Sequence, residues 1–221
     1  MKSRLIAAAL AAVTLPVAST AAPEKPSEQA SIEEQRRWFT EDDVAPTVKP
    51  PNYDVTIVEY TDYQCPYCRA THGPLKQLLA KDKKVRVIFR EWPIFGPASE
   101  AAALTAIASN YQGKYLAMHE ALMETPLPLN KDKIRAAAKT AGVDWDRLQK
   151  DMAAHSEEIE DLFQRNSEQA ESIGLEGTPG FIIGNVQSFG GMTLKQLETS
   201  VANARKANRE AAAKAGKAAG K

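Results

Sequence analysis

Two runs of β-branched and aromatic residues, at residues 55–60 and 85–90, predict buried strands. Both runs are apolar almost throughout, as expected for parallel strands that are covered on both faces of their sheet. The segment between them begins at Cys65-Pro66, where the proline suits the first position of a helix, and it carries leucines at helical spacing. This order of elements predicts a strand, a crossover helix and a second, parallel strand.

A long run of helix-forming residues, from 97 to 173, predicts an all-helical block. Glycines and prolines divide it into expected helices at residues 97–112, 114–124, 130–141, 144–154 and 156–173. Strand character returns at 181–183 and 186–189, around a Gly-Asn turn, and a final helix begins at Thr193. An antiparallel hairpin beside a parallel pair makes a mixed sheet, so the predicted fold class is α/β with an inserted all-helical subdomain.

The chain divides into segments of different composition. They are a leader (1–22), an arm and linker (23–52), a sheet domain in two pieces (53–96 and 174–207), the helical insertion (97–173) and a basic C-terminal tail (208–221). The arm is rich in Pro, Glu and Gln, but Ser31 to Phe39 predicts a short helix with Ser31 and Glu34 as its capping box. The apolar residues Ile32, Trp38 and Phe39 either dock on the domain, which we prefer, or contact another copy of the chain.

The first residues have the three-part pattern of a secretory signal peptide. Lys2 and Arg4 precede an apolar run from Leu5 to Val17, and small residues follow up to Ala22, where we expect cleavage. The run is too short to span a bilayer, and no later segment approaches the roughly 20 apolar residues of a membrane span. We therefore expect an exported protein of the periplasm that is not membrane-embedded.

Composition and charge exclude some classes of function. The chain has 221 residues, of which 43% are hydrophobic and 25% charged, as in an ordinary globular protein. Without residues 1–22 it keeps 26 basic and 28 acidic residues, and this near-neutral balance argues against a nucleic-acid role. Basic residues gather between Asn203 and Lys221, which we interpret as a solvated helix end, with weak attraction to an anionic surface as the alternative.

Cys65 and Cys68 are the only two cysteines, and they form a Cys-Pro-Tyr-Cys motif at the start of a predicted helix. As a structural cross-link they would close a four-residue loop, which gives about 2 kcal/mol, against about 4.7 kcal/mol for a 100-residue loop. A helix N-terminus carries unpaired N–H groups and partial positive charge, which lower the pKa of a thiol placed there. The motif therefore predicts a redox pair, with Cys65 as the nucleophile and Cys68 as the less exposed resolving thiol.

Four features together point to a known family. They are the strand at 55–60, the run from Glu59 to Cys68, the helical insertion, and Gly177-Thr178-Pro179-Gly180-Phe181 before the later strand. Over residues 54–207 they resemble the DsbA-like family of exported thiol:disulfide oxidoreductases, which have a thioredoxin fold. The resemblance implies a cis peptide between Thr178 and Pro179 beside the cysteine pair. It also implies a buried carboxylate at Glu59 that exchanges the proton of Cys68.

Several roles stay open within this resemblance. Backbone groups around Thr178 are expected to hold a client peptide by β-type hydrogen bonds, next to Pro66 and Tyr67. Tyr67 stands where the best-known DsbA proteins have histidine, and it stabilises a thiolate less because it cannot become cationic. The pair is therefore expected to be less oxidising, which leaves an oxidase and an isomerase open. The alternative for Glu59 is an edge-strand residue that faces water.

We expect Arg69 and His72 on the exposed outer side of the helix that follows the motif.

A structural zinc site lacks ligands, because the histidines are scattered and there is no second Cys-X-X-Cys pair. Copper(I) suits thiolates and needs fewer ligands, so a non-enzymatic copper-binding role is the main alternative. A scaffold or chaperone that uses the arm as its contact surface is the third hypothesis.

The preferred hypothesis needs neither a metal nor a cofactor. Its expected partners are unfolded or partly oxidised exported client proteins, and a redox partner that resets the cysteine pair. Self-association through the arm is a further expectation, and it would favour an isomerase, which usually needs several active sites facing a shared space.

Overall fold

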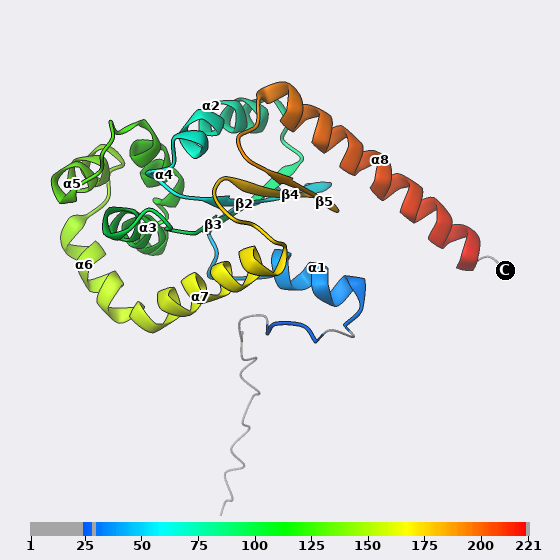
Figure 1. Ribbon diagram of the computed structural model, residues 1–221, viewed down its shortest axis with the longest axis horizontal. Helices are drawn as coiled ribbons and strands as arrows, with labels where there is room; N and C mark the ends of the chain where they lie inside the picture. The colour runs from blue at the N-terminus through cyan, green and yellow to red at the C-terminus, as the bar shows by residue number, and fades with distance from the viewer. Residues whose placement is uncertain (1–23, 28–29, 220–221) are drawn as a thin grey trace, which may run out of the picture.

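A mixed five-stranded sheet forms the centre of the protein in the computed structural model, which describes residues 24–27 and 30–219 (Figure 1). Its strands, in the sheet order β1-β3-β2-β4-β5, are β1 (Thr47–Val48), β2 (Val55–Thr61), β3 (Val85–Glu91), β4 (Gly180–Ile183) and β5 (Val186–Phe189). β2 and β3 are parallel and joined by α2 (Pro66–Lys81), and the other neighbouring pairs are antiparallel. The predicted mixed sheet is confirmed, whereas the leader expected at 1–22 lies outside the described residues.

β2 and β3 are the interior strands on which the site depends. Apart from Thr56 and Arg86, all their residues are buried. The parallel register places Glu59 beside Phe89, and Thr61 beside Glu91. Because side chains alternate between the faces of a strand, these four share one face of the sheet, and Tyr60 and Arg90 point to the other. Both faces of the central pair therefore carry polar groups within the core.

The helical block lies between β3 and β4 in the chain. Its helices are α3 (Pro97–Ser109), the short 3-10 helix η1 (Asn110–Gln112), α4 (Tyr115–Glu124), α5 (Lys131–Thr140), α6 (Trp145–Ala154) and α7 (Ser156–Ser172). α3 to α6 gather at one end of the sheet, and α7 runs back along one face (Figure 1). The side chains of Asn130 and Asp144 cap α5 and α6, as the sequence predicts. The domain boundaries given above stay a prediction.

The arm contributes α1 (Ile32–Thr40), which begins with the predicted capping box and lies against the body of the protein. Trp38 is only 4% exposed, and its carbonyl oxygen accepts a hydrogen bond from Nε2 of Gln169 in α7 at 2.6 Å. Ile32, in contrast, is 79% exposed. The arm therefore docks on the domain through Trp38 but not through Ile32.

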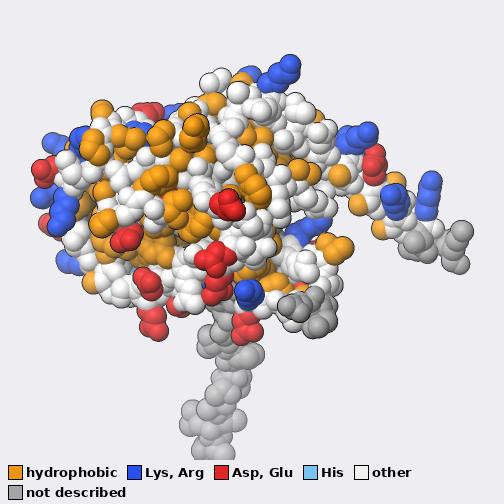
Figure 2. All heavy atoms as spheres, viewed as in Figure 1, with side chains coloured by type: hydrophobic (Ala, Val, Ile, Leu, Met, Phe, Trp, Pro, Cys, Tyr) orange, Lys and Arg blue, Asp and Glu red, His pale blue; other side chains and the backbone are white. Residues whose placement is uncertain are grey.

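The last helix, α8 (Leu194–Ala219), covers the α2 side of the sheet and then projects beyond the body (Figure 1). Basic side chains line its projecting part (Figure 2), and Lys206 and Arg209 are exposed, as in a solvated helix end. Arg205 differs, because it pairs with Asp82 at 2.6 Å and with Asp54 at 2.7 Å. No helix within the described residues has the length and apolar character needed to cross a membrane.

Candidate active site

The two cysteines lie at the start of α2, directly after β2. Cys65 is the N-cap residue and Pro66 the first helical residue, so the first sulfur lies at the end of α2 where the backbone N–H groups have no partner within the helix. Both cysteines are free thiols, and they keep 1% and 0% exposure. Pro66 and Tyr67 are exposed. The sulfurs thus lie just beneath a surface that the two middle residues of the motif form.

The surroundings of the two sulfurs shift the pKa values of Cys65 and Cys68 in opposite directions. The pKa of Cys65 is lowered to about 5, chiefly by the hydrogen bond from the Cys68 thiol, with help from the N–H groups of Cys68 and Tyr67 and against the effect of burial. Burial, and then the same bond to Cys65, raise the pKa of Cys68 far above its ordinary value. At neutral pH the pair therefore holds a thiolate on Cys65 and a proton on Cys68.

The peptide between Thr178 and Pro179 faces the first sulfur. This peptide is cis, as the resemblance implied. Its carbonyl oxygen lies 3.1 Å from Sγ of Cys65 and accepts a hydrogen bond from that sulfur when Cys65 is protonated. A groove of about 490 Å³ continues from this loop, lined by residues 174–179 together with Phe189 and Gly190. The loop therefore separates the nucleophilic sulfur from an open groove on the surface.

Glu59 lies inside the sheet, because β2 has β3 on one side and β4 on the other. It is 2% exposed, so the alternative of an edge residue facing water is wrong. Burial, and then the charge of Glu91, raise the pKa of Glu59 to about 8. A carboxyl with this pKa can give or accept a proton at neutral pH.

Glu91, at the end of β3, is a second buried carboxyl that the sequence analysis missed. Burial raises its pKa to about 8, although hydrogen bonds from the hydroxyls of Tyr63 and Tyr115 act in the opposite direction. The available signal was an acid at the end of an apolar strand, the same kind of signal that identified Glu59.

Asp62 is also absent from the predicted site, although it organises the loop before the motif. Its carboxylate accepts hydrogen bonds from Oγ of Ser99 at 2.7 Å and from the N–H groups of Ile94 and Phe95 at 2.8 and 3.1 Å. Its own N–H donates to Sγ of Cys68 at 3.5 Å. Asp62 thus ties the active-site loop to the segment after β3, where Ile94 and Phe95 are 41% and 50% exposed.

The expectation that Arg69 and His72 lie on the exposed side of α2 is wrong. The Arg69 guanidinium is partly buried and donates to the carbonyl oxygens of Tyr63 at 2.9 Å and Leu122 at 3.1 Å. His72 is partly buried as well, and its ring lies 5.3 Å from that of His119. The physical reason is that α4 packs on this side of α2, a contact between distant segments that the helical pattern does not reveal.

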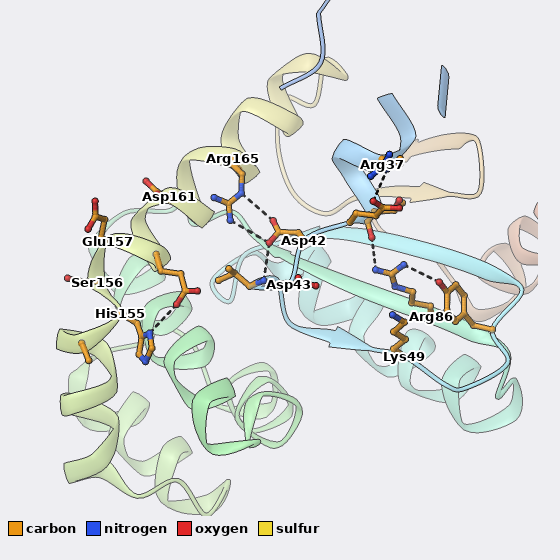
Figure 3. A pocket seen from close by; sticks show the side chains of 16 residues that line it. Arg37, Asp42, Asp43, Lys49, Arg86, His155, Ser156, Glu157, Asp161 and Arg165 are labelled. Atoms are coloured by element: carbon orange, nitrogen blue, oxygen red, sulfur yellow. Dashed lines mark hydrogen bonds and ion pairs between the residues drawn. The ribbon is translucent and has the colours of Figure 1, made fainter. Parts of the chain in front are cut away.

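A larger groove, of about 890 Å³, lies at the β1 side of the sheet (Figure 3). Its charged side chains pair largely with one another: Asp42 accepts hydrogen bonds from Arg165 at 3.3 Å, and Arg37 donates to Glu41 at 2.8 Å. The groove contains neither cysteine. Within the described part of the chain, no cluster of three or more His, Cys, Asp or Glu side chains is placed to hold a metal ion.

Comparison with known proteins identifies the family. The sequence model of one family, described as a DSBA-like thioredoxin domain, matches residues 56–202. The chain belongs to this family. The match begins in β2 and ends in α8, so the DSBA-like region includes the cysteine pair, the whole helical block and the hairpin that follows the cis peptide.

Solved structures of similar proteins superpose on most of this DSBA-like chain. A thioredoxin-like oxidoreductase from Silicibacter pomeroyi is 37% identical, with a TM-score of 0.73, over 77% of this chain and 98% of that one. The thiol-disulfide exchange protein alpha-DsbA2 from Wolbachia pipientis is 28% identical, with a TM-score of 0.73, over 78% and 92%. A curated relative, the Na⁺/H⁺ antiporter NhaA 1 of Salinispora arenicola, is 26% identical over 70% of this chain, which spans 24% of the antiporter's length.

Proposed function

We propose that this DSBA-like protein is an exported thiol:disulfide oxidoreductase that forms or reshuffles disulfides in client proteins through Cys65 and Cys68. The main support for this proposal is that the pKa values of the two thiols are shifted in opposite directions. A pKa of about 5 makes Cys65 a thiolate, while Cys68 keeps its proton. A stabilised thiolate favours the reduced form and makes the disulfide more oxidising. The similarity to a thioredoxin-like oxidoreductase from Silicibacter and to a thiol-disulfide exchange protein from Wolbachia supports the same chemistry.

The reaction begins when a client thiolate attacks Sγ of Cys65 in the oxidised protein. The bond between the two cysteine sulfurs breaks, a disulfide forms between the client and Cys65, and the Cys68 sulfur leaves with the electron pair. Protonated Glu59 supplies the proton that this sulfur takes up, since burial and the charge of Glu91 raise its pKa to about 8. A second client thiolate attacks the client sulfur of the mixed disulfide, and Cys65 leaves as the stabilised thiolate. The client loses two electrons, and the cysteine pair gains them.

The loop at Thr178 would hold the client beside the reacting sulfur. Its carbonyl oxygen lies 3.1 Å from Sγ of Cys65, and an extended client segment can pair with the backbone of this loop in the manner of an added strand. Pro66 and Tyr67 are exposed next to the first sulfur and would contact the same segment. After each cycle a separate redox partner must take the two electrons from the reduced pair.

Export and self-association are further parts of the proposal. The signal-peptide pattern at residues 1–22 supports a periplasmic location, where disulfides form and persist.

Ile32, exposed on a docked helix, is the candidate contact for a second copy. Light scattering of the wild type and Ile32→Asp tests this, because an aspartate suits the first turn of α1 and removes only the apolar contact. A monomer in both samples removes the basis for self-association.

Client oxidation tests the central reaction. We expect one molecule of oxidised protein to remove two thiols from a reduced, unfolded client, and Cys65→Ala to remove none. Reduced Cys68→Ala, mixed with an oxidised client, should accumulate a client–Cys65 disulfide, because no second sulfur is present to release it. Tight binding of copper(I) without thiol exchange would instead favour the copper-binding alternative.

A redox titration of the pair assigns the direction of electron flow. A potential near about −120 mV indicates a donor of disulfides, and one near about −270 mV indicates a reductant.

A further inference from the structure

Glu59 and Glu91 lie close together on the face of the sheet that α2 and α4 cover. In the register of β2 with β3 they are one strand apart and separated by two positions along the strands. Their exposures are 2% and 0%, and the Oε2 atom of each has no hydrogen-bond partner among the described residues. Two buried carboxyls in this arrangement do not ionise independently, because the charge of one disfavours the charge of the other.

Glu91 is held by the loop that carries the cysteine motif. Its Oε1 accepts hydrogen bonds from the hydroxyl of Tyr63 at 2.7 Å and from that of Tyr115, in α4, at 2.5 Å. Tyr63 precedes Cys65 by two residues in the same loop. Two donors on one oxygen favour the ionised carboxyl, whereas burial favours the protonated one. Glu91 is therefore connected to the motif and balanced between its two protonation states.

The groups around this carboxyl pair are largely uncharged. Tyr63 gives its only hydroxyl proton to Glu91, so Nδ1 of His119, 3.0 Å from the same hydroxyl, must carry a proton and donate it. Burial lowers the pKa of His119 to about 3, and burial also lowers the pKa of His72 in α2, so both rings are neutral near pH 7. Asp62, on the active-site loop, adds a negative charge that further disfavours ionisation of Glu91.

We propose that Glu91 is a positioning residue for thiol exchange, and that the coupled pair of Glu59 and Glu91, rather than Glu59 alone, stores the proton that Cys68 exchanges. This inference rests on the proposed function. When the disulfide opens, Glu59 gives its proton to the leaving Cys68 sulfur, and protonated Glu91 keeps the pair at a single negative charge. When Cys68 must lose its proton to resolve a mixed disulfide, the singly charged pair takes that proton back.

Titration of the two carboxyls in the oxidised protein tests the coupling without any client or free thiol. The glutamate Cδ resonances are followed by carbon-13 NMR, with Glu59→Gln and Glu91→Gln to assign them. In Glu91→Gln we expect the Glu59 midpoint to shift to lower pH, because in the wild type Glu91 ionises over the same pH range and its charge opposes the ionisation of Glu59. Glu59→Gln should abolish the upper of the two ionisation steps. Glutamine at position 91 still offers an oxygen to both tyrosines, so the fold should be kept.

Two tyrosine variants form a matched pair of controls. Tyr115→Phe removes one donor to Glu91 and should shift the Glu91 midpoint to higher pH. Tyr60→Phe removes a buried hydroxyl on the opposite face of the sheet, which donates to Oε1 of Gln169 at 3.1 Å. It should cost similar stability but leave both carboxyl midpoints unchanged. If the buried hydroxyls had a purely structural role, Tyr115→Phe and Tyr60→Phe would have the same effect on the two carboxyl midpoints.

The role of the carboxyl pair in thiol exchange is tested by the pH profile of client oxidation. In Glu91→Gln the half-maximal pH should shift in the same direction as the Glu59 midpoint. An unmoved Glu59 midpoint overturns the coupled pair even if the protein oxidises clients. An unmoved pH profile overturns the role of the pair in exchange. Coupled titration in a protein without any exchange activity refutes the proposed function, so the two failures are distinguishable.

Discussion

A few neighbouring groups decide where the protons of the cysteine pair reside. Cys65 stands at the N-cap of α2 and meets its N–H groups, whereas Cys68 lies one turn further on, inside the core. The first sulfur therefore ionises easily and the second resists ionisation. Glu59, buried on an interior strand, keeps a proton at a pH where an exposed glutamate would have lost it. Thiolate, thiol and protonated carboxyl are the states that the proposed exchange reaction needs.

Asp62 should contribute strongly to stability for a residue in a loop. Asp62→Ala removes the acceptor for Oγ of Ser99 and for three backbone N–H groups, at Gln64, Ile94 and Phe95, and we expect a loss of about 3 kcal/mol in the free energy of unfolding. Urea unfolding measures this loss. Asp43→Ala, which changes an exposed aspartate, should stay within about 0.5 kcal/mol of the wild type. Equal losses in the two variants would contradict the role given to Asp62.

At this scale the structure confirms the placement of residues whose surroundings are local in sequence, while their catalytic roles stay predictions. Pro66 marks the start of α2 and so identifies which sulfur meets the helix N-terminus, and Glu59 stands out as an acid within an apolar strand. Glu91 offered the same signal as Glu59, an acid in an apolar strand, but its contacts with Tyr63 and α4 could not be predicted. The role of Asp62 could not be predicted either, because it depends on contacts with α3 and with the segment after β3. Arg69 was placed wrongly for the same reason.

At the scale of helices and strands, the arm is attached to the body through Trp38 and the residues that follow it. Trp38 is buried at 4% exposure between α1 and the body, while Ile32 on the same helix is 79% exposed. The next residues continue the attachment, since Asp42 forms an ion pair with Arg90 at 2.6 Å and both side chains are fully buried. The arm is thus part of the folded domain from Trp38 onward.

Trp38→Ala should destabilise the protein by about 3–5 kcal/mol, the usual cost of removing a buried tryptophan. Ile32→Ala, on the same helix, should change the free energy of unfolding by no more than about 0.5 kcal/mol. Thermal or urea unfolding of the two variants gives both values. A small effect of Trp38→Ala would show that the arm is not docked in solution.

Most elements were predictable because their signals are local. Apolar runs identified β2 and β3, and the cap residues Asn130 and Asp144 identified the starts of α5 and α6. β1 was missed because it is a two-residue strand, defined by its pairing with β3 rather than by any pattern of its own. The packing of α4 against α2, which buries His72 in part, also depends on tertiary contacts that no single segment encodes.

At the scale of the whole molecule, the redox state of the pair and the stability of the fold are linked. The folded, reduced protein keeps a thiolate at Cys65 at a pH where an unfolded chain would bind a proton. The oxidised protein has no thiol at this position to titrate. Any pH dependence that belongs to Cys65 therefore appears only in the difference between the two redox forms.

The reduced protein should lose part of its stability as the pH falls. The pKa of Cys65 is depressed to about 5 in the folded state, against about 8.5 for an ordinary thiol, so its contribution is complete near pH 8.5 and lost as the pH approaches 5. We expect the free energy of unfolding of the reduced form, minus that of the oxidised form, to decrease between pH 8 and pH 5. Urea unfolding of both forms at each pH measures it. A difference that does not change with pH would refute the link.

The ionisation of Cys65 in the reduced protein is the most direct test of the account. Iodoacetamide reacts with thiolates, so the rate of alkylation at each cysteine, read by mass spectrometry, follows its ionised fraction. The account predicts a half-maximal rate at Cys65 near pH 5, while Cys68 stays unmodified at neutral pH. A half-maximal rate near the ordinary thiol value of about 8.5, or equal reactivity of the two cysteines, would contradict it.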